Sequence, residues 1–172
     1  MEKISGVKYQ DITSLQEIIY LVLRSNTQLA QDMRKKVRFR ERVGVYVYTD
    51  QLYTLISILN NLIVNALDAL PQEGMVEVGS KWVNDKEIQL WVADSGPGIR
   101  RGNASLIFDP GYTTKFYKDG SASTGIGLSH VHGLVKTLQG QIEVKTGEET
   151  DLKGAEFRVT IPVRNLIKGE GP

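Results

Sequence analysis

The chain has 172 residues, about the length of one domain, and 21 Lys and Arg against 20 Asp and Glu give a net charge of +1. This balance argues against a nucleic-acid-binding domain that relies on bulk charge, and the absence of cysteine excludes disulfides, thiolate zinc sites and cysteine nucleophiles. No apolar run approaches the roughly 20 residues of a membrane span and no secretory signal is visible, so we expect a cytoplasmic chain without direct membrane contact.

The first predicted helix covers residues 13–35, where apolar residues recur at helical spacing and Thr13 or Ser14 can cap the first turn. Apolar and polar residues then alternate over residues 37–48, which predicts one or two half-buried strands. Six basic residues fall within residues 34–42. We interpret them as the solvated face of a strand, with a docking surface for a partner as the alternative.

A second predicted helix runs from Leu52 to Leu70, with Asp50 as its cap and with Pro71 and Gly74 ending it. Its apolar residues again recur at helical spacing, which predicts that one face of this helix is buried.

The second half of the chain is predicted to contain two strand pairs and one helix. The first pair, at residues 75–83 and 87–93, is joined as a hairpin, and residues 94–124 have the composition of a loop. A helix at 126–138 that closes at Gly140, strands at 141–145 and 156–161, and a loose tail after Pro162 complete the chain. This order favours an α+β fold with a mixed, mostly antiparallel sheet and its helices on one face.

Three polar residues share one face of the second predicted helix. Asn61, Asn65 and Asp68 are four and three residues apart, although amides in mid-helix are mediocre helix formers. They form either an exposed polar face or a face for metal and phosphate, since amide oxygens suit Mg²⁺.

A carboxylate follows the predicted strand that ends at Ala93. Asp94 precedes Gly96, Gly98 and Ile99, in a pattern that forms either a simple turn or a buried acceptor for the amino group of adenine. In the second case the glycines allow the base to lie against the backbone.

Two further segments carry groups that suit phosphate. The turn signal Pro110-Gly111 is followed by hydroxyls and an ammonium group, although alone such a stretch is typical of a surface turn. Glycines at the start of the third predicted helix expose backbone amides that favour an anion. The residues concerned are Thr113, Thr114 and Lys115 in the first segment, and Thr124, Gly125, Ile126, Gly127 and Leu128 in the second.

In this order and with these separations, the four segments resemble the nucleotide-binding boxes of the GHKL superfamily, which includes gyrase B, the heat-shock chaperones, histidine kinases and MutL. The resemblance covers residues 45–162. The N box corresponds to 61–65, the first glycine box to 94–98, the F box to 108–115 and the second glycine box to 125–128. These boxes are most similar to those of citrate- and dicarboxylate-sensing and sporulation-type sensor histidine kinases. Asn61 stands where the gyrase and MutL branches carry a glutamate base, which favours phosphotransfer over an ATP-driven clamp.

The resemblance implies a two-layer α/β sandwich, the Bergerat fold, that binds ATP and Mg²⁺ and transfers the γ-phosphate to a histidine on a separate dimerisation domain. A response regulator would act downstream. The resemblance also implies that Asn65 holds Mg²⁺, that Asp94 binds adenine, and that Asn61 and Lys115 take part in catalysis. The implied ATP-binding residues are Asn61, Asn65, Asp68, Asp94, Gly96, Gly98, Ile99, Phe108, Tyr112, Thr113, Thr114, Lys115, Thr124, Gly125, Ile126, Gly127 and Leu128.

Three features depart from the family pattern. Ser123 replaces a glycine of the second glycine box, and Ala155 replaces a threonine before the last strand, so lid geometry and one hydroxyl near Asp94 are in doubt. The chain has no phosphoacceptor motif. His130 and His132 lie two residues apart on the third predicted helix, and we expect them to pack or to face solvent.

We interpret residues 37–162 as the catalytic domain, 1–36 as an N-terminal helical segment at the linkage to a phosphoacceptor domain, and 163–172 as a tail. The missing acceptor favours a piece of a longer kinase, which could be the cytoplasmic part of a membrane-bound sensor. Two alternatives stay open, namely a stand-alone serine kinase of the anti-sigma type and a nucleotide-gated binding module without transfer activity.

Overall fold

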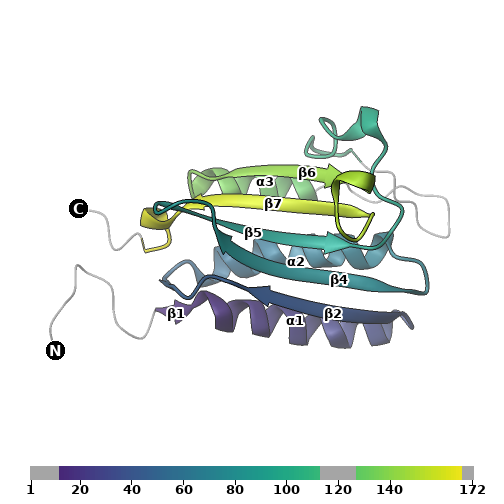
Figure 1. Cartoon of the computed structure of the whole chain (residues 1–172), viewed down its shortest axis with the longest axis horizontal. Helices are drawn as coiled ribbons and strands as arrows, with labels where there is room; N and C mark the ends of the chain where they lie inside the picture. Colours follow the sequence, from purple (N-terminus) through teal and green to yellow (C-terminus); the bar gives the residue numbers. More distant parts are fainter. Residues whose placement is uncertain (1–11, 113–126, 168–172) are drawn as a thin grey trace, which may run out of the picture.

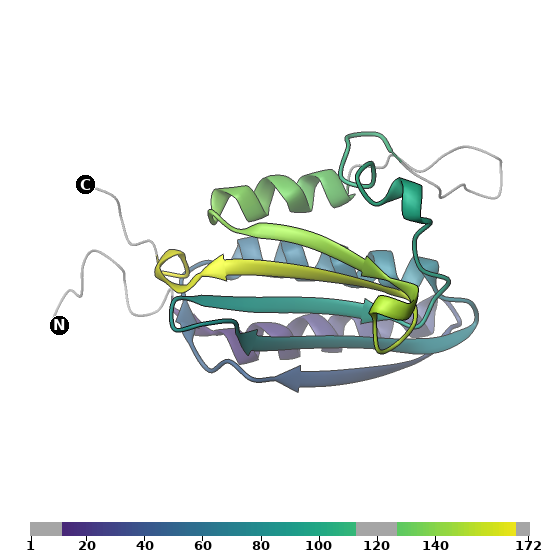
Figure 2. The ribbon, with the colours of Figure 1, turned by 45° about the horizontal axis from the view of Figure 1, so that its top comes forward.

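The structure, a computed structural model, describes residues 12–112 and 127–167. A five-stranded sheet forms one layer, and the three helices of the described residues cover one of its faces (Figures 1 and 2). The predicted α+β sandwich, with a mixed sheet on three helices, is therefore confirmed.

The five-stranded sheet has the order β2-β4-β5-β7-β6, while β1 and β3 pair separately. β2 runs parallel to β4, and the other three pairs of the five-stranded sheet are antiparallel. The helices are α1 (Leu15–Asp32), α2 (Leu52–Ala69) and α3 (Gly127–Thr137). The strands are β1 (Thr13–Ser14), β2 (Lys36–Val43), β3 (Tyr48–Thr49), β4 (Glu73–Trp82), β5 (Glu87–Asp94), β6 (Gln141–Thr146) and β7 (Ala155–Pro162).

The core lies between the sheet and the helices, and α2 occupies its centre between α1 and α3. Each helix buries the apolar stripe that the helical spacing predicts, and each fully buried Leu or Ile contributes about 1.5–3 kcal/mol relative to exposure. Among the described residues, α2 is also the one helix whose length and apolar composition would allow it to cross a membrane. Its buried side chains belong to the core, namely Leu55, Ile58, Leu59, Leu62, Ile63, Ala66 and Leu67.

The predicted cap of α2 is wrong. The N-cap residue is Gln51, which makes no side-chain capping bond, and the side chain of Asp50 accepts a hydrogen bond from Gln51 Nε2 instead. The backbone N–H of Gln51 donates to Thr49 Oγ1 at 3.0 Å, so a threonine two residues upstream orders this turn.

The segment after β7 was predicted to be a loose tail, and this is wrong for residues 163–166. They form a short 3-10 turn whose last side chain, Leu166, is 1% exposed. The Leu166 carbonyl accepts from the Asp50 N–H at 3.0 Å and from Thr49 Oγ1 at 2.5 Å. These bonds attach the end of the described chain to the turn before α2.

β4 begins at Glu73, earlier than predicted, because its parallel pairing with β2 extends to that residue. Gly74 therefore lies inside a strand and does not end the preceding helix. A Cβ on Gly74 would lie 2.5 Å from a methyl group of Leu70, so a larger residue here would displace the Leu70 side chain at the end of α2.

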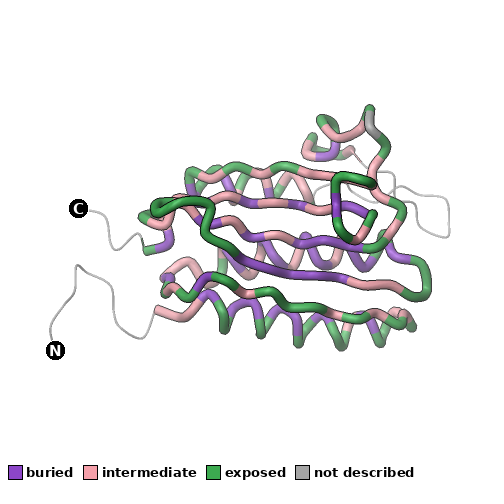
Figure 3. Tube along the Cα trace, in the orientation of Figure 1, coloured by how far each residue is buried: buried purple, intermediate pink, exposed green. Residues whose placement is uncertain are grey.

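The basic residues of β2 lie on the exposed face of an edge strand, whereas β4 and β5 are largely buried (Figure 3). Arg40 and Arg42 both pair with Glu77 on β4, whose side chain is nearly buried. The Trp91 indole on β5 also donates to Glu77, at 2.9 Å. The interpretation as a strand face is thus confirmed for the four basic residues of β2, whereas Arg34 and Lys35 precede the strand. The alternative of a docking surface stays a prediction.

Candidate functional site

The predicted site residues of the described chain gather at one end of the sandwich. The segment that follows β5, up to residue 112, lies beside the start of α3 in both Figure 1 and Figure 2. Contacts join the motifs directly. Gly96 lies against the carbonyl of Ala69 at the end of α2, and Gly127 at the start of α3 lies against Asn61.

Asp94, the last residue of β5, is 2% exposed and is held by backbone amides. Its Oδ1 accepts from the N–H of Gly96 at 2.8 Å and from the N–H of Ala155 at 3.3 Å. Burial raises the pKa of this carboxyl, and these two hydrogen bonds oppose that effect in part. Both of these bonds use Oδ1, and among the described residues none donates to Oδ2, so this second oxygen can accept a further hydrogen bond.

The loop after Asp94 is attached to the end of β6 by one hydroxyl. Thr146 Oγ1 accepts from the N–H of Ile99 at 2.7 Å and donates to the carbonyl of Ile99 at 3.3 Å. Gly98 has a φ of 75°, and a Cβ there would lie 2.5 Å from the same hydroxyl. Glycine is therefore needed at position 98 for the loop to reach Thr146.

The pair Gly154-Ala155 supports Asp94 from β7 and from the turn before it. A Cβ on Gly154 would lie 2.1 Å from the backbone oxygen of Asp94 and 2.4 Å from its Oδ1, so no side chain fits. Ala155 supplies a backbone N–H to Asp94 but no hydroxyl. Alanine in place of the family's threonine at position 155 thus removes a hydroxyl near Asp94, while the hydrogen bond from the backbone N–H remains.

The polar face of α2 begins with two amides. The side chains of Asn61 and Asn65 are half-buried, and Asp68 is exposed one turn further on. Asn61 Nδ2 donates to the Ser57 carbonyl at 2.7 Å, which turns its Oδ1 toward Gly127, 3.5 Å from where a Cβ would stand. An oxygen acceptor thus faces the amino end of α3, where Gly127 and Leu128 begin the helix. This end carries the positive end of the helix dipole.

The third motif packs by its aromatic ring. Phe108 stacks on His132 of α3 with ring centroids 5.7 Å apart, and it meets Phe157 of β7 edge-on. The packing role expected for His132 is therefore confirmed. His130 Nε2 lies 3.4 Å from Ser57 Oγ on α2. Tyr112, the last described residue of this segment, is partly buried against the core.

Several predicted site residues lie outside the described residues, and their roles stay predictions: Thr113, Thr114, Lys115, Ser123, Thr124, Gly125 and Ile126.

Sequence reasoning missed Thr146 and did not give Gly154 its role beside Asp94. Thr146 directly follows the predicted strand at 141–145, and its contact with Ile99, 47 residues away, is what distinguishes it. The available signal was the pair of glycines at 147 and 154, which bracket a short turn directly after that strand.

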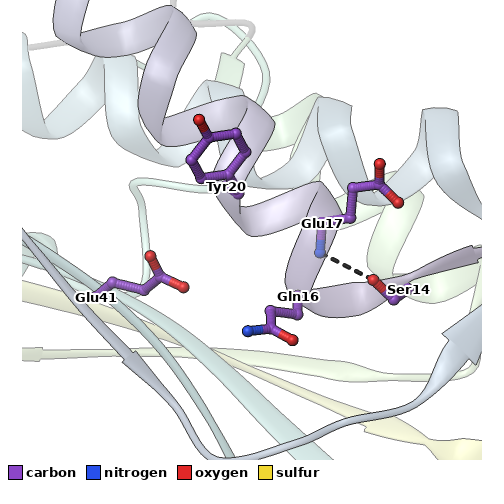
Figure 4. A pocket seen from close by; sticks show the side chains of 5 residues that line it. All are labelled: Ser14, Gln16, Glu17, Tyr20 and Glu41. Atoms are coloured by element: carbon purple, nitrogen blue, oxygen red, sulfur yellow. Dashed lines mark hydrogen bonds between the residues drawn. The ribbon is translucent and has the colours of Figure 1, made fainter.

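A separate hollow lies between the start of α1 and β2, lined by Ser14, Gln16, Glu17, Tyr20 and Glu41 (Figure 4). The Glu17 N–H donates to Ser14 Oγ at 3.1 Å there, which confirms the predicted cap of α1. None of the predicted site residues lines this hollow.

Comparisons with known proteins identify the family and the fold of the chain. Residues 51–165 match the family model described as histidine kinase-, DNA gyrase B-, and HSP90-like ATPase. The sensor histidine kinase GlnK of Bacillus subtilis (strain 168) is 33% identical over 96% of this chain. The sensor histidine kinase ZraS of Salmonella typhimurium (strain LT2) is 33% identical over 87% of it. The chain spans only 39% and 30% of the length of these two relatives.

Solved structures show the same fold. The catalytic domain of histidine kinase ThkA is 25% identical, with a TM-score of 0.71 over 91% of this chain and 98% of that domain. The mycobacterial sensor histidine kinase MprB is 21% identical and shares the fold, with a TM-score of 0.72 over 88% of this chain and 95% of the other. The chain therefore belongs to the histidine kinase-, DNA gyrase B- and HSP90-like ATPase family, as a catalytic domain of the sensor histidine kinase type.

Proposed function

We propose that this domain binds Mg²⁺-ATP and transfers the γ-phosphoryl group to a histidine on a separate dimerisation domain. One observation carries the proposal, the setting of Asp94. A buried carboxylate with one oxygen held by two backbone amides and the other available is suited to accept from the exocyclic amino group of adenine. Gly96 and Gly98 support this setting by letting the loop pack tightly, because a side chain at either position would crowd Asp94 or Thr146.

The face of α2 supports a phosphate and Mg²⁺ site next to this pocket. Asn65 is our candidate to hold Mg²⁺, because an amide oxygen is a hard ligand that shares the ion with phosphate oxygens and water. Asn61, with Oδ1 turned toward the start of α3, lies where it can orient a metal-bound water or a phosphate oxygen. Asp68 is placed one turn further along the same face.

Bound ATP supplies the phosphoryl group, which passes through a loose transition state that requires mainly positioning and charge neutralisation. Asp94 fixes the base, the amides at the start of α3 draw the phosphates, and Asn61 and Asn65 orient the charged end. We further propose that Thr113, Thr114 and Lys115 cover the triphosphate, with Lys115 neutralising charge.

The partners follow from the same proposal. The relatives are longer sensor kinases, which supports an acceptor domain elsewhere in the full-length protein and a response regulator downstream. The catalytic reaction consumes ATP, so we place the domain in the cytoplasm.

The proposal is tested by incubating the chain with γ-labelled ATP, Mg²⁺ and a candidate dimerisation domain. We expect acid-labile label on that domain, as phosphohistidine requires. Acid-stable label would indicate a serine kinase instead, and tight nucleotide binding without any transfer would indicate a binding module. A chain that binds no nucleotide would overturn the proposal.

The metal role of Asn65 is tested separately by Asn65→Asp. The added charge should change the Mg²⁺ dependence of nucleotide affinity and lower the rate of transfer, as calorimetry at several Mg²⁺ concentrations would measure. Asn84→Asp is the control, because it makes the same chemical change in the exposed hairpin between β4 and β5. Its oxygen still accepts from the N–H groups of Lys86 and Glu87, and the bond it loses, from Nδ2 to the Glu87 carboxylate, is exposed. Unchanged Mg²⁺ dependence in Asn65→Asp would remove Asn65 as the ligand.

A further inference from the structure

One polar side chain interrupts the buried apolar stripe of α1. Asn26 is 1% exposed, and every other buried residue of that helix is apolar. Its Nδ2 donates to the Val22 carbonyl of its own helix at 2.8 Å and to Asn60 Oδ1 of α2 at 2.9 Å. Both hydrogens of the Asn26 amide are therefore paired, at the cost of placing a polar pair between two packed helices, with Asn26 buried and Asn60 half-buried.

Such a pair fixes how two helices sit against each other. An apolar interface accepts small rotations and shifts, because side chains of similar shape can repack. A buried asparagine accepts fewer, since any shift that separates Asn26 from Asn60 breaks one of the two hydrogen bonds of the buried amide. A single asparagine sets the register of coiled coils in a similar way. α1 and α2 pack along each other, so the bond ties the rotation of α2 to α1.

Asn60 directly precedes Asn61 in α2. Successive helix residues are about 100° apart, so the two neighbouring amides point to different elements. Asn60 meets Asn26 on α1, whereas Asn61 Oδ1 faces Gly127 on α3. A rotation of α2 by about 20° would move side-chain heads about 5–6 Å from its axis by about 2 Å. A misplacement of about 1 Å is already costly for phosphoryl transfer.

We infer that the Asn26–Asn60 hydrogen bond sets the rotation of α2 and thereby positions Asn61 and Asn65 toward the phosphates. Both residues of the pair are positioning residues that act through the site face of α2. The inference rests on the proposed function, because it assumes that this face meets the charged end of the nucleotide. Asp94 is held by the backbone N–H groups of Gly96 and Ala155. α2 reaches this setting through the Ala69 carbonyl beside Gly96, so we expect adenine binding to depend less on the pair than the Asn61 face does.

Two variants of the chain test this inference. Asn60→Ala removes the bond between the helices while Asn26 keeps its bond to Val22, and Asn26→Leu with Asn60→Leu replaces the polar pair by an apolar one. Three quantities are measured for each variant. Calorimetry gives the affinity for a non-hydrolysable ATP analogue with Mg²⁺, an NMR titration gives the affinity for adenosine, and thermal unfolding gives the melting temperature. We expect about a tenfold loss of affinity for the Mg²⁺-bound analogue, adenosine affinity within about twofold of wild type, and no fall in the melting temperature of the double variant.

Thr27→Val is the matched control. Among the described residues, Thr27 Oγ1 bonds only within α1, to the Leu23 carbonyl at 2.9 Å, so its loss should leave both affinities unchanged. Unchanged affinity for the analogue in Asn60→Ala, or equal losses for the analogue and adenosine, would overturn the inference while leaving the proposed function in place. A wild-type chain that binds neither ligand would overturn the proposed function itself and the inference with it.

Discussion

Asp94 binds a proton more readily in the folded chain than in the unfolded one, because burial raises its pKa. Its contribution to stability is therefore greatest below its unfolded pKa and is lost as the pH rises through its folded pKa. Recognition of an amino group requires the ionised form of Asp94, since a carboxylate is a stronger hydrogen-bond acceptor than a protonated carboxyl group. Stability and nucleotide affinity should thus respond to pH in opposite directions at this residue.

Asp94→Asn separates the two effects. The amide oxygen still accepts from Gly96 and Ala155, so the free energy of unfolding at neutral pH should not fall, whereas nucleotide affinity should drop by at least about tenfold. In the wild type, affinity should fall as the pH is lowered through the raised pKa of Asp94. Calorimetry and denaturant unfolding over a pH series measure both quantities.

Asp85→Asn provides the control, because Asp85 is an exposed carboxylate in the hairpin far from Asp94. Its nucleotide affinity should follow the wild-type pH profile. If Asp94→Asn binds ATP with wild-type affinity, Asp94 is not the adenine acceptor.

We expect Thr146 to support nucleotide binding near Asp94, because its hydroxyl holds the loop at Ile99. Thr146→Val keeps the shape of the side chain and removes the hydroxyl, which should cost about 1 kcal/mol and weaken nucleotide binding about fivefold. Thr160→Val, on β7, is the matched control, because its hydroxyl contacts only Gln89 on the neighbouring strand. Equal affinities in the two variants, measured by calorimetry, would exclude this role for Thr146.

These two residues show how far sequence reasoning reaches at this scale. Asp94 could be identified because its neighbours Gly96 and Gly98 mark it locally. Thr146 could not, because its partner lies 47 residues away and a threonine at a strand end is ordinary.

At the scale of elements, the carboxyl end of α2 depends on a lysine from another segment. Lys35 Nζ donates to the Leu67 carbonyl at 2.6 Å and to the Leu70 carbonyl at 2.7 Å, and α2 has no basic residue in its own last turn. A cation at this end stabilises the last carbonyls and the helix dipole.

Lys35→Met should therefore lower the free energy of unfolding by about 1–2 kcal/mol, as denaturant unfolding would measure. Lys36→Met is the control, since the Lys36 side chain is 85% exposed and its ion pair with Glu73 is also exposed. That variant should change stability by less than about 0.5 kcal/mol. If both variants unfold at the same denaturant concentration, Lys35 does not stabilise α2.

Helix ends were harder to predict than helix bodies, because their hydrogen-bond partners lie far away in the sequence. The body of α2 follows from its apolar spacing, but its ends depend on partners that are distant in the sequence. Asp50 is a good local cap, yet the chain orders this turn with Thr49 and the carbonyl of Leu166. Lys35 caps the other end across 32 and 35 residues.

At the scale of the whole molecule, the last described turn belongs to the core. Leu166→Ala should lower the free energy of unfolding by about 2–3 kcal/mol, because it opens a cavity at a side chain that is 1% exposed. Ile167→Ala is the control, since that side chain is 44% exposed and should matter little. Thermal or denaturant unfolding measures the stability of both variants. If the two variants are equally stable, the turn that carries Leu166 does not contribute to the core.

α1 contributes to the same core, so we propose that it is part of the catalytic domain and not only a linker to it. The class of the fold could be predicted because strand pairs with short turns favour antiparallel pairing. The parallel pairing of β2 and β4 could not, since no local signal specifies which strand a crossover through α2 will meet.

Thr49 joins the two places where the described chain enters and leaves the fold. Thr13 pairs with Thr49 in the β1–β3 pairing, and the hydroxyl of Thr49 bonds to Leu166 near the other end. In Figure 1, β1 and the turn that follows β7 both lie at the end of the sandwich opposite the start of α3. A short linker can therefore join the two ends of the described chain. Opening the chain instead at the exposed hairpin of residues 83–86 gives a circular permutant, whose new ends also lie away from Asp94.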